Sequence, residues 1–418
     1  MKLPICAPVS QGILAIVCVG VATHGTVALA YTCPEPSTNS LFNLSMCVES
    51  EFTSVGSNSL TDVVGLIHED ELKKRFPGYE YGVSAGGFLL DVRGIPLTIG
   101  YERNSTILVF AVPSRGINET FDGGTRDASN DLLRAYINQN GDDVLRELVS
   151  VSSVDPLAGN PDSLQSTMVA SDFGAGVDPI YDTLKRGSSF GLGARFGSYS
   201  LGQSTQNSFT LPIDYTYTFS NYDKLIVRAP LAYIDVDGAK AYRGNLGLSY
   251  KKSIFRRWAL TPSVGYGITG SSDLGSHGHI ISGSLTSDLM LYESGNYQLS
   301  MGNLAGYYVT MPVRVDDYSV DYDLQNTIIR NGLLFSMPLR QQVWGRDFSV
   351  DIYITDTRFF GDALYSDNYQ EVGISFGPMR SANKLEPNLA SHPIGLGIKY
   401  VQGAGDVKGL ELTFGYRF

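Results

Sequence analysis

Apolar and polar residues alternate through the second half of the chain. The clearest run covers residues 209–219, where threonine, proline and aspartate separate the apolar positions Phe209, Leu211, Ile213, Tyr215, Tyr217 and Phe219. Side chains of a strand point alternately to its two faces, so a period of two predicts a strand with one apolar and one polar face.

The same pattern returns up to the C-terminus. Regular runs lie at 225–233, 246–250, 281–291, 348–354, 372–376, 394–400 and 410–418, and less regular ones at 188–199, 256–268, 295–310 and 314–337. Together they make about twelve strands, and an even number of antiparallel strands closes into a barrel with both ends on one side. We therefore predict an all-β transmembrane barrel of about twelve antiparallel strands over residues 185–418.

The polar face of these strands favours a barrel lumen over the outer face of a soluble sandwich. It carries mostly serine, threonine, glycine and asparagine, where a soluble sheet would carry many lysines and glutamates. The charged residues expected to face the lumen are Asp214, Arg228, Arg243, Asp288, Asp351, Lys399 and Glu411. Lys399 and Glu411 share the lumenal parity on successive strands, which predicts a structural ion pair.

The last strand carries a more specific signal. Residues Leu410, Leu412, Phe414, Tyr416 and Phe418 form an alternating strand with an aromatic end, as bacterial outer-membrane barrels present to their insertion machinery. We expect Phe414, Tyr416 and Phe418 to be this insertion signal, with the barrel assembly machinery and outer-membrane lipid as partners. A secreted β-sandwich or adhesin is the alternative.

The N-terminus reads as a secretory signal peptide over residues 1–30. Lys2 precedes an apolar core at 13–19, and Ala28-Leu29-Ala30 provides the small residues of a cleavage site. Two of the four cysteines, Cys33 and Cys47, remain after cleavage. In an oxidising compartment we expect them to form one local disulfide.

Residues 31–184 form an N-terminal mixed α/β segment. Helical spacing is found at 60–67, 127–138, 142–149 and 163–171, and short apolar runs at 82–92, 97–101 and 107–112 suggest a small antiparallel meander. The helices between 127 and 172 directly precede the first strand of the barrel. They either fill the pore as a plug or cap a small extramembrane domain.

Composition and charge narrow the class of protein. The chain has 42 acidic and 31 basic residues, with a formal net charge of −11, which excludes a nucleic-acid partner because phosphate neutralisation needs clustered basic surface. Only 17% of the residues are charged, while glycine (46) and tyrosine (25) are abundant. This balance suits a secreted β protein or an outer-membrane barrel.

A C-terminal barrel that ends in an aromatic strand and follows directly on helical sequence resembles the translocator domain of type V autotransporters. The stretches 110–117, 124–130 and 155–161 resemble more closely the solitary outer-membrane autotransporter-like barrel proteins, which lack a large passenger. The resemblance implies a location in the cell outer membrane and a pore plugged or gated by the upstream helices. The upstream segment has no solenoid repeat. The linker 174–187 lacks the Asn-Asn pair at which some autotransporters cut themselves, so we do not expect autoproteolysis.

Candidate chemistry is sparse. His277 and His279 share a strand face with Asp273 nearby, but a solvated loop end is the favoured interpretation over a metal site. The chain contains no G-x-S-x-G, H-E-x-x-H or P-loop motif, so we expect no enzyme and no cofactor. A barrel hydrolase that uses His392 is a minor alternative, and a surface adhesin or structural barrel is another.

The expected topology assigns the turns to two sides. If the C-terminus is periplasmic, the turn at 403–405 is extracellular and the segment 379–391 is periplasmic. We expect the outer loop 356–368, with Phe359, Phe360 and Tyr365, to contact an extracellular ligand.

Overall fold

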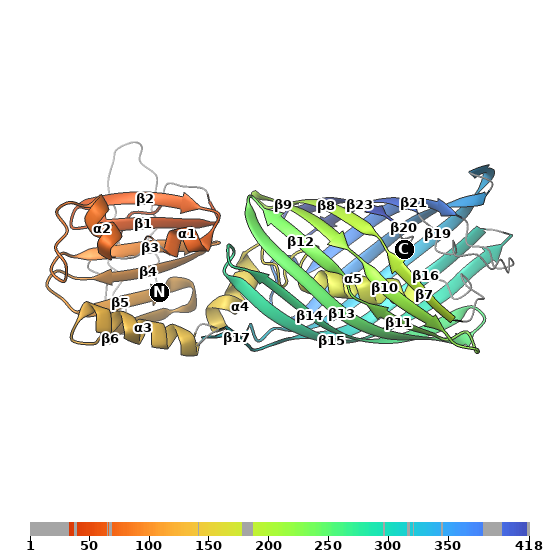
Figure 1. The fold of residues 1–418 in the computed structure, drawn as a ribbon, viewed down its shortest axis with the longest axis horizontal. Coiled ribbons are helices and arrows are strands. Elements are labelled where there is room, and N and C mark those ends of the chain that lie inside the picture. The colour runs from red at the N-terminus through yellow and green to blue at the C-terminus, as the bar shows by residue number, and fades with distance from the viewer. Residues whose placement is uncertain are drawn as a thin grey trace, which may run out of the picture.

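The computed structural model describes residues 33–36, 40–64, 66, 69–140, 142–177, 187–295, 297–315, 318–320, 322–343, 346–378 and 395–415. The signal peptide, the segment 379–391, His392, Tyr416 and Phe418 lie outside these ranges. The described chain forms an N-terminal sheet domain and a β-barrel, arranged end to end along the long axis of the molecule (Figure 1).

The described residues form a closed antiparallel barrel of twelve strands, as the alternation predicts. β23 pairs with β8 and closes the circle, with Phe414 opposite Ala194. The first three strands are each split in two, at Gly193, Pro212 and Ala229-Pro230; proline has no N–H for the ladder. The strand segments are β7 (Gly187–Leu192) with β8 (Ala194–Leu201), β9 (Ser204–Leu211) with β10 (Ile213–Thr218), β11 (Lys224–Arg228) with β12 (Leu231–Val236), β13 (Ala239–Phe255), β14 (Trp258–Ser271), β15 (Ser276–Ser294), β16 (Tyr297–Met311), β19 (Gln325–Val343), β20 (Arg346–Gly361), β21 (Asn368–Pro378), β22 (Leu396–Gly403) and β23 (Val407–Phe414).

The outer face of the barrel is apolar. Leu246, Leu248 and Tyr250 of β13 are exposed, and so are Leu410 and Leu412 of β23. The alternate positions of the same strands, such as Ser249 and Glu411, are buried inside. None of the helices in the described ranges is long and apolar enough to cross a membrane.

The N-terminal domain is built on a six-stranded antiparallel sheet with the order β2-β1-β3-β4-β5-β6. β3 (Gly86–Val92), β4 (Ile95–Tyr101) and β5 (Ile107–Val112) correspond to the predicted meander. Sequence reasoning missed β1 (Phe42–Val48), β2 (Glu51–Ser57) and β6 (Ile117–Asp122). β1 alternates in sequence as the barrel strands do, and its apolar residues Phe42, Leu44 and Met46 are fully buried.

The helices of this domain cover one face of the sheet in two pairs. α1 (Leu60–Val64) and α2 (Glu69–Arg75) enclose one apolar core with β1 and β3. α3 (Arg126–Asn140) and α4 (Asp142–Val151) enclose a second core with β5. The predicted helices at 127–138 and 142–149 agree with α3 and α4, whereas the helix expected over 60–67 ends at Val64.

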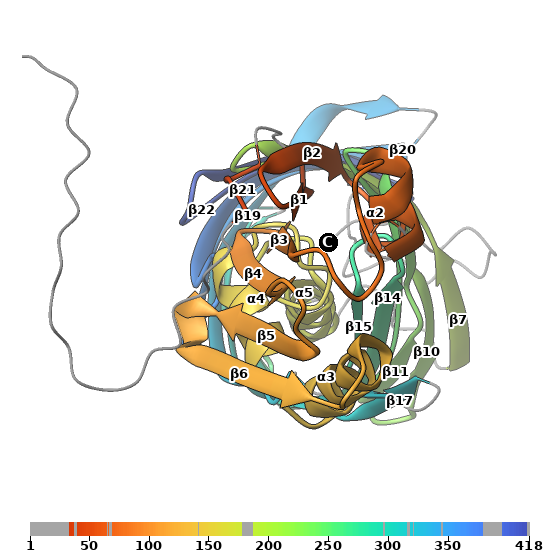
Figure 2. The ribbon, with the colours of Figure 1, turned by 90° about the vertical axis from the view of Figure 1, so that its left-hand side faces the viewer.

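The helix α5 (Leu164–Val177) lies inside the barrel, whereas α3 and α4 lie outside it (Figures 1 and 2). It contacts β13, β14, β15, β16 and β19. Of the helices predicted between 127 and 172, the structure thus places one inside the barrel and two outside it. The N-terminal domain sits at the barrel end where β23 begins, opposite the end where β23 stops at Phe414.

Candidate functional site: the occupied lumen

The inner wall of the barrel is shaped around α5 by glycines. A Cβ atom on Gly302 of β16 would overlap Val177 and lie 2.7 Å from Phe173, and one on Gly332 of β19 would lie 2.9 Å from Phe173. A Cβ on Gly267 of β14 would lie 2.6 Å from Met168. Such distances are shorter than real Cβ contacts, so these wall positions fit α5 only because they lack a side chain. The high glycine content thus has a structural use in the lumen.

Charged side chains of the wall hold α5 at its middle. The Asp172 carboxylate accepts hydrogen bonds from Arg228 Nη2 at 2.7 Å, Tyr308 Oη at 2.9 Å and Ser284 Oγ at 3.0 Å. Asp172, Arg228 and Tyr308 are buried, and a buried carboxylate is tolerated only when it is paired and hydrogen-bonded. Asp172 therefore fixes the depth of α5 in the barrel.

The C-terminal end of α5 meets a lysine. Lys251 Nζ of β13 donates to the carbonyl of Gly176 at 2.5 Å and pairs with Asp288 of β15 at 3.1 Å. Helices leave their last carbonyls without intrahelical partners and carry partial negative charge at that end. Lys251 satisfies one such carbonyl and compensates the charge.

The segment 152–163 closes the barrel end that carries the N-terminal domain. Asp162 accepts from Arg243 Nη2 at 2.9 Å and from Gln206 Nε2 at 2.8 Å. Asp155 pairs with Arg93 of the N-terminal domain at 3.0 Å and accepts from Ser276 Oγ at 3.1 Å. We call this barrel end the mouth and the segment 152–163 the mouth segment. Around the polar contacts, buried apolar residues of the segment and of the strand ends form one core, the mouth core: Val149, Val154, Leu157, Ala158, Leu201, Val236, Leu274, Tyr322 and Val407. In this core, burial raises the pKa of the Tyr322 hydroxyl above its usual range.

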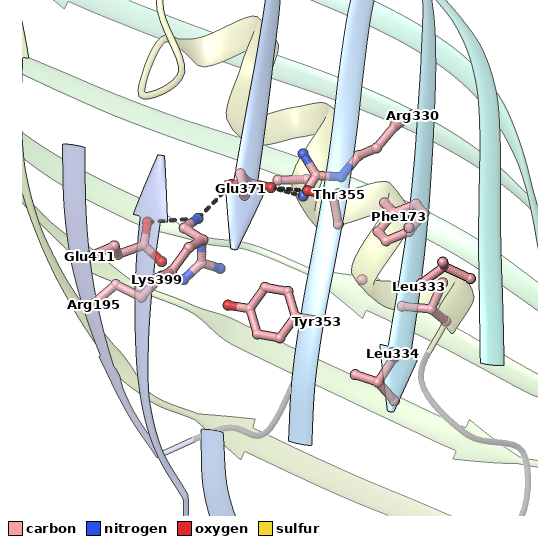
Figure 3. A pocket seen from close by; sticks show the side chains of 14 residues that line it. Phe173, Arg195, Arg330, Leu333, Leu334, Tyr353, Thr355, Glu371, Lys399 and Glu411 are labelled. Carbon is pink, nitrogen blue, oxygen red and sulfur yellow. Dashed lines mark hydrogen bonds and ion pairs between the residues drawn. The ribbon is translucent and has the colours of Figure 1, made fainter. Parts of the chain in front are cut away.

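The inner wall from β19 to β23 carries a ladder of opposite charges (Figure 3). Lys399 Nζ lies 2.8 Å from Glu371 and 3.2 Å from Glu411, and Arg330 pairs with Glu371 on its other side. The guanidinium of Arg330 also lies over the ring of Phe173, 5.1 Å from its centroid. The ladder thus joins β19, β21, β22 and β23 to one another, and its Arg330 contacts α5 through Phe173.

A small cavity remains between α5 and this ladder. Its volume is about 90 Å³, and it is lined by Phe173 and Val177 of the helix and by Tyr353, Arg330 and Lys399 of the wall. A void of this size has room for a few water molecules.

The structure places the seven expected lumenal residues on the inner side of the wall. Arg228 and Arg243 bind carboxylates of α5 and of the segment before it, and Asp288 binds Lys251. Lys399 and Glu411 face each other across β22 and β23, as their parity predicts. Asp214 stands opposite Arg228 in the β10–β11 register, and Asp351 is buried on β20.

Sequence reasoning missed the partners of these residues. Asp155, Asp162 and Asp172 looked like ordinary polar residues of a loop and a helix. Arg330 lies in the less regular run 314–337 and Glu371 directly precedes the run 372–376, and lumenal parity is the signal that could have found them. The predicted third helix, 163–171, also stopped short of Val177, since the small polar residues of α5 give it no apolar stripe.

Three other predicted features lie away from this site. The sulfur atoms of Cys33 and Cys47 form a disulfide, with Cα atoms 5.6 Å apart. His279 Nδ1 lies 2.6 Å from Tyr266 Oη, and His277 is half-buried. The described residues contain no group of three or more His, Cys, Asp or Glu side chains that could hold a metal ion. Phe414 is exposed at the outer surface, at the end of β23.

The expected outer loop 356–368 is much shorter than predicted. Residues up to Gly361 belong to β20, and β21 begins at Asn368. Phe359 is buried in the mouth core. Tyr365 N donates to the carbonyl of Val149 at 2.9 Å, and Ser366 N to that of Gly159 at 3.1 Å. This hairpin turn supports the mouth segment because its backbone donors bind there.

Comparison with known proteins gives matches to solved structures. No family model and no curated protein matches the chain. The beta domain of the Bordetella autotransporter BrkA is similar at 15% identity and a TM-score of 0.41, over 55% of this chain and 100% of that one. The translocator domain of the autotransporter NalP from Neisseria meningitidis is similar at 12% identity and a TM-score of 0.40, over 61% and 96%. An outer-membrane channel from Pseudomonas putida F1 is similar at 12% identity and a TM-score of 0.37, over 58% and 100%.

Proposed function

We propose that this protein is an autotransporter-like outer-membrane barrel whose lumen is permanently closed by α5 and which displays its N-terminal domain at the cell surface. The observation that carries the proposal is the fit of α5 to the wall. The wall glycines leave room for this helix, and a wall arginine and a wall lysine bind its carboxylate and one of its last carbonyls. A substrate that only passes through the pore would not need a wall fitted to it in this way.

Membrane insertion follows from the outer face of the barrel. Its exposed leucines, isoleucines, valines and aromatics form a continuous apolar surface, which in water would be an aggregation hazard. Alternation of an apolar outer and a polar inner face is the pattern of outer-membrane barrels.

The direction of α5 supports the proposal of surface display. The helix enters the barrel at the end that carries the N-terminal domain, and β7 begins at the opposite end, where β23 also stops. Both barrel termini of an even-stranded outer-membrane barrel face the periplasm in the proposed topology. The sheet domain then lies outside the cell, anchored by one helix through the membrane.

Cysteine labelling on intact cells tests this topology. Gln139→Cys places a thiol at an exposed position of α3, and Arg256→Cys places one in the turn at the other end of the barrel. A membrane-impermeant maleimide should label Gln139→Cys on intact cells and Arg256→Cys only after the outer membrane is permeabilised. Labelling in the reverse pattern would contradict surface display.

A further inference from the structure

The N-terminal domain has a groove on the helical face of its sheet. α1 and α2 pack over β1 and β3, α3 and α4 pack over β5, and no helix of the described chain covers the seam over β3 and β4 (Figure 1). The groove between α2 and α3 has a volume of about 600 Å³. Ligand sites of proteins commonly have volumes of this order.

The floor of the groove is apolar and aromatic, and each wall carries one exposed side chain with apolar surface. Phe88 of β3 and Ile99 of β4 stand opposite each other in register and form the floor. Tyr81 on one wall is 51% exposed, and Ile137 of α3 on the other wall is 42% exposed. These two side chains contribute little to the domain core, so their apolar surface is available to a partner.

Carboxylates lie on both rims of the groove. Asp70 of α2 accepts a hydrogen bond from Tyr81 Oη at 2.8 Å, and Asp127 and Asp131 lie on α3 across from it. Of the two arginines that line the groove, Arg134 is paired with Asp131 at 3.2 Å. Arg126 is buried, its Nη2 donates to the carbonyl of Ser84 at 2.8 Å, and its guanidinium lies 4.7 Å from the centroid of the Tyr101 ring.

The charge of the whole domain has the same sign as the rims. Residues 40–151 contain nine basic and sixteen acidic residues, a formal net charge of −7 out of −11 for the chain. A surface of one sign raises the local concentration of partners of the opposite sign and their association rate. The groove therefore combines an apolar floor with a negative field.

We propose that this groove binds a cationic amphipathic peptide segment, with its apolar side chains on Phe88 and Ile99 and its basic side chains toward Asp70 and Asp127. Laying an amphipathic peptide into an apolar groove is a common mode of recognition, and opposite charges on the rims select the partner and its orientation. The inference deepens the proposed function, since it rests on surface display for access to peptides outside the cell.

Binding is measured with the full chain in nanodiscs of zwitterionic lipid, with empty nanodiscs as the blank. The probe is a fluorescent lysine–leucine peptide with a helical amphipathic pattern. The double variant Asp70→Asn, Asp127→Asn should weaken binding about tenfold, and Ile137→Ser should weaken it several-fold. The matched control Glu51→Gln, Glu119→Gln removes the same charge from β2 and β6 outside the groove, and should leave the affinity within about twofold of wild type.

Three results would overturn the groove as the peptide site: equal binding of a glutamate–leucine peptide, equal weakening by the control variant, or unchanged binding by the groove variants. Binding of a neutral oligosaccharide that depends on Tyr81 and not on the rim charges would assign the groove to another ligand. The assay uses purified protein, so its outcome is separate from the labelling on cells that tests surface display.

Discussion

Asp172 of α5 and Arg228 of β11 form a buried ion pair, with 2.7 Å between Oδ1 and Nη2, across the inner surface of the barrel. The two residues are 56 positions apart in the chain and come from different parts of the fold. The pair has its counterpart nearer the mouth, where Asp162 meets Arg243. Both contacts require α5 and the segment before it to be seated at one depth.

The first prediction concerns this pair. Asp172→Ala leaves Arg228 charged and buried without its carboxylate, and breaking one side of a buried pair costs about 3–5 kcal/mol. We expect the helix to be loosened, so that the barrel shows open events in planar-bilayer recordings while the wild type stays closed.

The double variant Asp172→Ala, Arg228→Met removes both charges and should recover part of the loss, because no unpaired charge remains. Asp131→Ala, which removes an exposed carboxylate from α3, serves as the control and should leave the conductance unchanged. A wild-type barrel that conducts as freely as the Asp172→Ala variant would contradict the permanent plug.

A second prediction concerns the wall glycines that leave room for α5. Gly302→Val puts a branched side chain where Val177 and Phe173 lie, and overpacking of this kind costs about 1–3 kcal/mol. We expect the barrel of this variant to melt at a lower temperature. In gels, it should change from folded to unfolded migration after heating to a lower temperature than the wild type needs. Gly283→Val is the control, since Gly283 of β15 lies on the outer face and no atom lies within 4 Å of a Cβ there. Adding Phe173→Ala to Gly302→Val should restore part of the stability, and failure to do so would place the clash elsewhere.

The barrel could be predicted from the sequence because its surfaces follow one local rule. Lipid-facing and lumenal residues alternate along every strand, as in Leu246, Leu248 and Tyr250 of β13, so periodicity alone finds the strands. The charged inner residues follow from parity, and for that reason Lys399 and Glu411 could be paired before the fold was known.

The occupant of the lumen could not be predicted in the same way. α5 is surrounded by a wall, so it has no polar face toward water and no apolar stripe to mark it. Asp172 holds the helix only because an arginine 56 residues later binds it, and a glycine is needed at position 302 only because Phe173 lies against it. Such pairings are set by tertiary contact rather than by local pattern. The loop expected at 356–368 is shorter for a related reason, because Phe359 is buried in the mouth core and the backbone N–H of Tyr365 binds the carbonyl of Val149.

A third prediction concerns the disulfide between Cys33 and Cys47. A cross-link across 14 positions restricts the unfolded chain and contributes about 3 kcal/mol in the loop-entropy account. Reduction by dithiothreitol should therefore lower the temperature at which the N-terminal domain unfolds and leave the barrel transition unchanged. The variant Cys33→Ser, Cys47→Ser should unfold at the reduced temperature with or without the reductant. Equal unfolding of oxidised and reduced wild type would contradict a stabilising role.

The last prediction concerns how the N-terminal domain is held on the barrel. Arg93 in the turn between β3 and β4 donates to Asp155 of the mouth segment at 3.0 Å and to Ser276 of β15 at 3.0 Å, and both ionic side chains are shielded from solvent. Arg93→Met leaves Asp155 charged in an apolar mouth, at a cost of about 3–5 kcal/mol. We expect the mouth segment to open, so that limited proteolysis cuts between Val151 and Leu164 in the variant and spares the wild type. Arg103→Met removes an exposed arginine from the neighbouring turn and should cleave like the wild type. If Arg93→Met resists the protease as well as Arg103→Met does, the apolar mouth core alone holds the domain in place, and the ion pair then serves only to satisfy two buried charges.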